Sequence, residues 1–300
     1  MEDIFYHEPV LLNEVKELLL TNKDSTQQRL YVDCTLGGGG YTKMILDETG
    51  SDVKVLGIDK DEQAIRYSKK RLEAYSNRLF FNRGNFRNIK QITGAIGFEK
   101  VSGIVMDLGL SSYQIESEDG FSYQRDTVLD MRADSSQKLM AKDILNSYSE
   151  KELFNIIHNY GELKYSRQIS RDIVSSRNTK KFESTFDLAE LLKQKIPYKY
   201  VNRDLSKVFQ ALRIEVNNEL ENLELAIDDS AEILEEGGRI VIVSYHSLED
   251  RIVKNKFRSN ENLRVITKKP VEASEEEISK NTRARSAKLR TAEKVHEKNN

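Results

Sequence analysis

The hydrophobic pattern of the chain changes character near residue 136. Before that point, short apolar runs alternate with stretches such as 61–75, in which apolar residues recur at helical spacing. The runs that read as β-strands cover 30–33, 53–59, 78–83 and 101–107, with one later run at 239–244. Strands that alternate with helices and tight loops are typical of a parallel sheet with helices on both faces. The pattern therefore predicts an α/β fold.

From 136 to 207 the apolar spacing is mostly helical. Ser149 and Glu152 form a capping-box pattern, which is typical of a helix start. We therefore expect a helical domain at 136–207, inserted into a discontinuous domain made of 1–135 and 208–300. The last twenty residues contain few apolar groups, so we expect them to form a tail or a loosely ordered arm.

Composition excludes several classes of protein. In 300 residues, no apolar stretch approaches the length of about 20 that a helix needs to cross a bilayer. The start of the chain lacks the basic and apolar regions of a signal peptide. Cys34 is the one cysteine, which rules out an intramolecular disulfide and fits a reducing compartment. We expect a cytoplasmic protein that makes no membrane contact.

The net charge of −2 is an average over unlike segments. Segment 251–300 has 14 basic against 7 acidic residues, and segment 161–210 has 11 against 6. Two basic segments therefore accompany an acidic remainder. Such segments are either ordinary solvated helix surface or a means of attracting polyanions.

Four consecutive glycines, 37–40, follow the first predicted strand. Glycine lets the backbone turn sharply and approach a ligand closely. Asp59 comes nineteen residues after the last of these glycines, at the end of the second strand, where a carboxylate accepts hydrogen bonds from ribose hydroxyls. The alternatives are a plain flexible turn and a nicotinamide dinucleotide site. The glycine spacing departs from G-x-G-x-x-G, and Asp33 precedes the cluster, a pattern that resembles the first motif of S-adenosylmethionine-dependent methyltransferases.

A second motif, DLGLSS, begins with Asp107 at the end of the fourth predicted strand. Ligands of open α/β sheets bind beyond the carboxyl ends of the strands, so this loop should line the same crevice as the glycines. Further motifs follow in order along the chain. They are HEPVLL at 7–12, GFSY at 120–123, LDMR at 129–132, FQALRI at 209–214, SYHSLEDR at 244–251 and RARSAKLR at 283–290. From residue 7 to about residue 294, this series resembles the MraW family of bacterial small-subunit ribosomal RNA cytosine-N4 methyltransferases.

The resemblance implies a Rossmann-like methyltransferase sheet with a helical inserted domain that recognises the substrate. It implies methyl transfer from S-adenosylmethionine to the exocyclic N4 of one cytidine in 16S ribosomal RNA, near the decoding centre. The cofactor-binding residues that it implies are Gly39, Gly40, Tyr41, Asp59, Phe86, Asp107 and Gln114. Tyr41 stands where the family usually has histidine, and Thr127 and Val128 replace a Gly-Pro pair, which changes the expected substrate loop.

For catalysis, we expect Asp107 and the loop after it to accept hydrogen bonds from the target amine. Asp107 binding only the cofactor is the alternative. N-methylation needs no cysteine nucleophile, and Cys34 is expected to be a small buried residue inside the glycine motif. Candidate substrate contacts are Ser111, Ser112, Tyr123, Arg125, Asp130, Arg132 and His246. A helix-capping role for His246 is an equally good hypothesis.

The four histidines show no metal-ligand spacing, so we expect no metal. The expected partner is small-subunit ribosomal RNA, with the two basic segments contacting phosphates. Three other functions stay open: a methyltransferase for a small molecule or protein, a nicotinamide-dependent oxidoreductase, and a catalytically silent assembly factor. The sequence leaves the oligomeric state open between monomer and homodimer.

Overall fold

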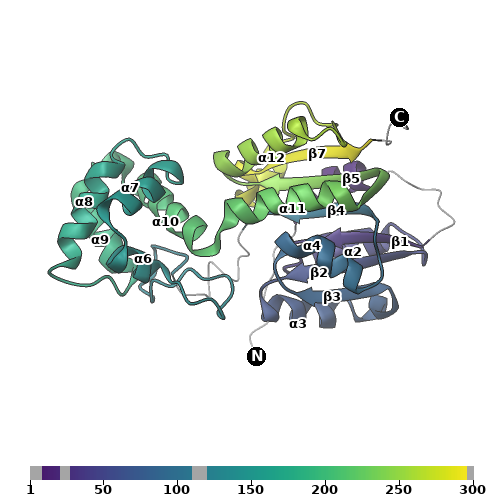
Figure 1. Ribbon diagram of the computed structural model, residues 1–300, viewed down its shortest axis with the longest axis horizontal. Helices are drawn as coiled ribbons and strands as arrows, with labels where there is room; N and C mark the ends of the chain where they lie inside the picture. Colours follow the sequence, from purple (N-terminus) through teal and green to yellow (C-terminus); the bar gives the residue numbers. More distant parts are fainter. Residues whose placement is uncertain (1–8, 21–27, 110–119, 296–300) are drawn as a thin grey trace. The chain divides into compact units, whose positions relative to one another are not determined.

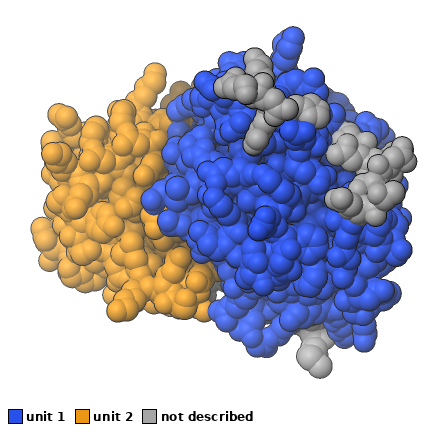
Figure 2. Space-filling view, turned by 45° about the vertical axis from the view of Figure 1, so that its right-hand side comes forward, with its two compact units in different colours: residues 1–109, 220–300 blue, residues 110–219 orange. Residues whose placement is uncertain are grey.

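The computed structural model describes residues 9–20, 28–109 and 120–295. The chain divides into two compact units, shown in different colours in Figure 2. One unit comprises 1–109 and 220–300, and the other comprises 110–219. Among the described residues, none of the helices has both the length and the apolar character needed to cross a membrane.

A mixed β-sheet forms the centre of the first unit (Figure 1). Its strands in the described residues are β1 (Arg29–Asp33), β2 (Val53–Asp59), β3 (Leu79–Arg83), β4 (Val101–Asp107), β5 (Leu234–Ser244), β6 (Leu263–Val265) and β7 (Lys288–Lys294). Their order across the sheet is β3-β2-β1-β4-β5-β7-β6. Strands β1 to β5 run parallel, and β7 is antiparallel to both of its neighbours.

Helices cover both faces of this sheet because its strands are apolar on both faces. The helices of the first unit are α1 (Leu12–Leu19), α2 (Gly40–Asp47), α3 (Glu62–Arg71), α4 (Ile89–Ala95), α11 (Glu219–Ile233), α12 (Ser247–Ser259) and α13 (Glu275–Lys280). On one face, Met106 and Ile242 pack with Ile227 of α11. On the other, Val105 packs with Ile45 of α2. The predicted α/β class is therefore confirmed.

The strand order places a switch point between β1 and β4. From β1 the chain proceeds outward to β2 and β3, and it then returns to place β4 and β5 on the other side. Ligands of open α/β sheets bind at such a point, beyond the carboxyl ends of the strands. The crevice expected from the sequence is thus set by the topology of the sheet.

The prediction of a C-terminal tail or arm is wrong. Residues 282–294 form the short helix η4 (Thr282–Ser286) and the interior strand β7. Arg290 is buried, and its Nε and Nη2 donate to the two carboxylate oxygens of Asp250 at 2.6 and 3.2 Å. Lys294 Nζ donates to the carbonyl oxygen of Ala231 at 2.8 Å. A count of apolar residues misses this strand because partners far away in the sequence neutralise its charged side chains.

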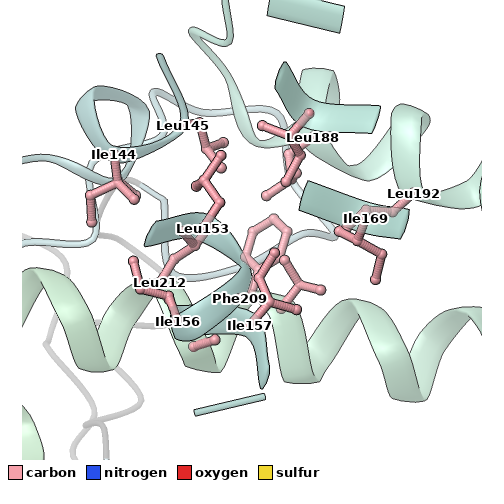
Figure 3. Close-up of a cluster of buried hydrophobic side chains, with 14 of the residues drawn as sticks. Ile144, Leu145, Leu153, Ile156, Ile157, Ile169, Leu188, Leu192, Phe209 and Leu212 are labelled. Atoms are coloured by element: carbon pink, nitrogen blue, oxygen red, sulfur yellow. The ribbon is translucent and has the colours of Figure 1, made fainter. Parts of the chain in front are cut away.

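The second unit is helical, as its apolar spacing predicts. Its helices in the described residues are α6 (Ala141–Ser147), α7 (Glu150–Asn159), α8 (Ser166–Arg177), α9 (Thr185–Lys195) and α10 (Val201–Asn217), with the short η3 (Tyr198–Tyr200) before α10. Figure 3 shows the core that they share, in which Leu153, Ile157 and Leu188 lie around Phe209. Capping boxes at Ser149 and Ser184 fix the starts of α7 and α9.

The helical unit extends beyond the predicted limits of 136 and 207, because it spans 110–219. On the N-terminal side, Leu129 and Met131 are buried in its core. On the C-terminal side, Leu212 and Val216 of α10 belong to the same core. Long-range packing, rather than the change of periodicity, sets the limits of this unit.

Candidate active site

The glycine turn is tied to the end of β2 through Asp59. Gly37 N donates to Asp59 Oδ2 at 2.8 Å, and Asp61 N donates to Oδ1 at 3.0 Å. Burial raises the pKa of Asp59 to about 6, and these two backbone hydrogen bonds oppose the rise. Each carboxylate oxygen has a second lone pair with which to accept another donor. The carboxylate is therefore held in one orientation and keeps the capacity to bind a pair of ribose hydroxyls.

Asp33 is fully buried at the end of β1, where it accepts hydrogen bonds from the glycine turn and from α2. Thr42 N and Oγ1 donate to its Oδ2 at 3.2 and 2.8 Å, and Thr35 N donates to its Oδ1 at 3.3 Å. Burial raises the pKa of Asp33 to about 6. Both oxygens are engaged with the turn and the first residues of α2, so Asp33 orients the loop.

Asp107 ends β4, and several groups fix its position. Its backbone N donates to Thr35 Oγ1 at 2.6 Å, and Gly109 N donates to its Oδ1 at 3.3 Å. Burial raises the pKa of Asp107, while the neighbouring Tyr245 hydroxyl lowers it. The Tyr245 hydroxyl is buried and makes no hydrogen bond of standard geometry within the described residues. A Cβ on Gly109 would lie 2.7 Å from Tyr245 Cε2, so glycine is needed there to let the ring reach the strand end.

The segment before α1 packs directly on the glycine turn. Gly39 has a φ of 74° and caps α2, and a Cβ on Gly40 would lie 2.2 Å from Pro9 Cγ. Tyr41 is buried, and its hydroxyl donates to the carbonyl oxygen of Val10 at 2.5 Å. Because the Tyr41 side chain is occupied in this contact, only its backbone is left for a cofactor.

Phe86 begins the short helix η2 (Phe86–Asn88), just after β3. Its ring is half-buried against the core of the first unit, and Lys60 Nζ lies 5.8 Å from the ring centroid. Cys34 is buried next to Asp33, and burial raises the pKa of its thiol well above the usual value. A thiol in that setting is a poor nucleophile, which agrees with the structural role expected for it.

His246 is the N-cap of α12. Its Nδ1 accepts a hydrogen bond from Glu249 N at 3.4 Å, and its Nε2 lies 3.1 Å from Glu249 Oε1. Glu249 Oε2 in turn accepts from Tyr245 N at 2.8 Å. The capping role that the sequence left open is therefore present in the structure.

Among the described residues, four predicted substrate residues belong to the helical unit. Tyr123 Oη lies 3.0 Å from Ser206 Oγ, and Arg125 is exposed. Arg132 Nε and Nη2 donate to Asp130 Oδ1 and Oδ2 at 2.6 and 2.8 Å. Both members of this ion pair are mostly buried, so the pair serves first to hold its own loop together.

Three further predicted residues, Ser111, Ser112 and Gln114, lie outside the described residues. Among the described residues, Thr35, Thr42 and Tyr245 belong to the site although they were not predicted as site residues. Tyr245 had a usable signal, because it directly follows a predicted strand and so belongs to the edge where ligands bind. The two threonines had no such signal. Thr42 acts through a hydrogen bond to Asp33, and Thr35 acts through a hydrogen bond from the backbone of Asp107, and neither partner can be identified from the sequence.

Comparison with known proteins identifies the family of this chain. Residues 4–295 match the model of the MraW methylase family. The chain belongs to this family. Ribosomal RNA small subunit methyltransferase H of Carboxydothermus hydrogenoformans is 46% identical over 97% of this chain and 98% of its own length. The protein of the same name from Finegoldia magna is 42% identical, over 97% and 99%. A solved rRNA methylase from Streptococcus thermophilus aligns with a TM-score of 0.42 and 12% identity, over 95% of this chain and 94% of its own.

Membership of the MraW methylase family confirms the predicted family, and with it a methyltransferase that uses S-adenosylmethionine. The residues of the first unit fit this cofactor. The Asp59 carboxylate keeps acceptor capacity for a ribose, and the glycine turn lies beside it. At the neighbouring strand ends, the buried Tyr245 hydroxyl interacts with the Asp107 carboxylate and lowers its pKa.

Proposed function

We propose that this MraW methylase transfers a methyl group to the exocyclic N4 of a cytidine in small-subunit ribosomal RNA, near the decoding centre. The observation that carries the proposal is the fixed carboxylate of Asp107 at the switch point of the sheet. The names of the curated relatives support ribosomal RNA of the small subunit as the substrate. The chemistry of the strand ends supports an amine as the acceptor.

Bound S-adenosylmethionine supplies an electrophilic methyl group, and the electron pair of the broken carbon–sulfur bond stays on sulfur. The residues that would hold it are the backbone of Gly39, Gly40 and Tyr41, the carboxylate of Asp59 and the ring of Phe86. Gln114 and Asp107 complete the predicted set. Asp59 would accept hydrogen bonds from the ribose hydroxyls, and Phe86 would pack beside the adenine.

The cytosine amine is a poor nucleophile, because its lone pair is delocalised into the ring. An acceptor on one amine hydrogen favours a pyramidal nitrogen, whose lone pair is available for the new nitrogen–carbon bond. Asp107 suits this role because Thr35 and Gly109 hold it at the strand end. The proton that the amine loses passes to Asp107 or to solvent. Positioning of amine and methyl group supplies much of the acceleration.

The helical unit, 110–219, is proposed to recognise the RNA in the cytoplasm. It contains Tyr123, Arg125 and the whole of the basic segment 161–210. A cytidine in a folded RNA must be extruded or met before the RNA folds, and aromatic and basic side chains stabilise such a base.

The test is to incubate immature small subunits with labelled S-adenosylmethionine and to map the modified nucleoside. Label on N4 of one cytidine is expected. Label on another atom, or no label on any ribosomal RNA intermediate, would refute the proposal. Transfer of the label to a small molecule or a protein in the same incubation would favour a methyltransferase for that kind of substrate.

The role of Asp107 is tested separately with Asp107→Asn. We expect kcat to fall about 100-fold or more, because an amide cannot accept the proton. The dissociation constant for S-adenosylmethionine should change only slightly. The matched control is Asp228→Asn, a half-buried aspartate of the same unit that pairs with Lys256 away from the strand ends. A variant that loses cofactor affinity instead of kcat would assign Asp107 to the cofactor alone.

A further inference from the structure

An exposed aromatic cluster stands at the start of α10 in the helical unit. Tyr198 is 97% exposed, and Tyr165 and Tyr200 are 37% and 36% exposed. These rings lie among the most exposed large apolar side chains of the described residues. Single exposed apolar residues are ordinary, but a group of tyrosines with cations beside them suggests a recognition surface.

The cluster is held together by a buried carboxylate. Asp204 is fully buried, and its Oδ1 accepts a hydrogen bond from Arg203 Nε at 2.7 Å. Its Oδ2 accepts from the Tyr165 hydroxyl at 2.9 Å. The Arg203 guanidinium lies over the Tyr200 ring, 4.6 Å from the centroid. The rings of Tyr165 and Tyr200 and the Arg203 guanidinium are thus positioned before any ligand binds, which lowers the entropy cost of binding.

The segment that leads into α10 carries only positive charge. Between Glu190 and Asp204 the chain has four basic residues and no acidic one. Lys195 and Lys199 are exposed, and Lys199 Nζ lies 5.7 Å from the Tyr200 centroid. Cations next to aromatic faces are the combination with which proteins bind single-stranded nucleic acid, because rings stack on bases while cations meet phosphates.

We propose that Tyr165, Tyr198, Lys199, Tyr200 and Arg203, here called the aromatic–basic surface, bind unpaired bases of the substrate RNA. This inference rests on the proposed function and names the surface that holds the RNA. Tyr198 offers a free ring on which a base stacks, and the Arg203–Tyr200 pair offers a second stacking plane. Lys199 neutralises a neighbouring phosphate. Double-stranded RNA suits the surface poorly, because its stacked bases cannot reach the rings.

Tyr198→Ala is the first test, because a side chain exposed to this degree contributes little to folding. The probe is a short single-stranded oligoribonucleotide that carries 2-aminopurine, whose fluorescence falls on stacking. We expect the dissociation constant of the full-length protein to rise about 5- to 150-fold, the range for losing one stacked base. Tyr200→Ala should act in the same direction.

Phe186→Ala is the matched control. Phe186 is 36% exposed and has Lys193 Nζ 6.0 Å from its ring centroid, but it lies at the opposite end of α9. The control should bind RNA like the wild type. A salt series separates the two kinds of contact. Tyr198→Ala should leave the slope of log affinity against log salt unchanged, whereas Lys199→Gln should reduce it by about 0.7.

Affinities of Tyr198→Ala and Tyr200→Ala within about twofold of the wild type would overturn the proposal. Normal binding of naked RNA with weakened binding of immature subunits would also overturn it, because the surface would then contact a ribosomal protein. Failure of the proposed function has a different signature: the wild type would transfer no methyl group to the subunits, whatever the oligoribonucleotide titration showed.

Discussion

The raised pKa of Asp59 predicts that cofactor binding weakens in mild acid. The carboxylate accepts ribose hydroxyls best when it is ionised, and burial raises its pKa to about 6. Falling pH protonates it, so affinity should be present above pH 6 and lost below. At pH 5 the dissociation constant for S-adenosylmethionine should be about 11-fold higher than at pH 8. If the pKa of Asp59 had its ordinary value of 3.8, the dissociation constant would change very little over this range.

The assay is calorimetric titration of the cofactor from pH 8 to pH 5, on the wild type and on Asp59→Asn. The variant should bind more weakly at pH 8 and lose most of the pH dependence. Ionisation of the ligand itself acts on both proteins and cancels in their ratio. Any dependence that remains in the variant beyond that of the ligand reports the other two buried carboxylates, Asp33, whose pKa is also about 6, and Asp107, whose pKa burial raises.

Unfolding does not account for the expected loss. For both groups the folded-state pKa lies above the unfolded value, so the folded protein binds more protons between about pH 4 and 6. Their contribution to stability therefore increases as the pH falls through that window. A wild-type dissociation constant that stays flat from pH 8 to 5 would refute the reasoning, as would an equal pH dependence in Asp59→Asn.

Four other substitutions test the first unit, three of them through its stability and one through the pH profile of kcat. Gly40→Ala should lower the free energy of unfolding by about 1–3 kcal/mol in urea, because its Cβ meets a proline ring, whereas Gly94→Ala, with open space around its Cβ, should be neutral or stabilising. Equal effects of the two would contradict this packing. Arg290→Ala should cost about 3–5 kcal/mol, because it leaves a mostly buried carboxylate unpaired; a loss below about 1 kcal/mol would mean that the pair is exposed in solution. Tyr245→Phe should move the acid limb of kcat to higher pH, since the hydroxyl lowers the pKa of Asp107, and an unshifted profile would remove Tyr245 from the site.

Local patterns were a good guide to the elements that carry the cofactor chemistry. The strands ending at Asp33, Asp59 and Asp107 follow from short apolar runs, and each carboxylate lies at a strand end as predicted. Patterns were a poor guide to residues that act through distant partners. Nothing local marks Thr35 as the residue that accepts from the backbone of Asp107, or the Tyr41 hydroxyl as a donor to Val10.

The sequence by itself determined the α/β class, the helical insertion, the glycine turn and the acid that follows it. Each depends on periodicity or spacing within a short window, and backbone geometry makes such features local. Only the tertiary structure decided that 282–294 is an interior strand, that Arg290 pairs inward, and that His246 caps a helix. These outcomes depend on partners brought together by folding. A charged side chain has the same appearance in the sequence whether solvent or a buried carboxylate is its partner.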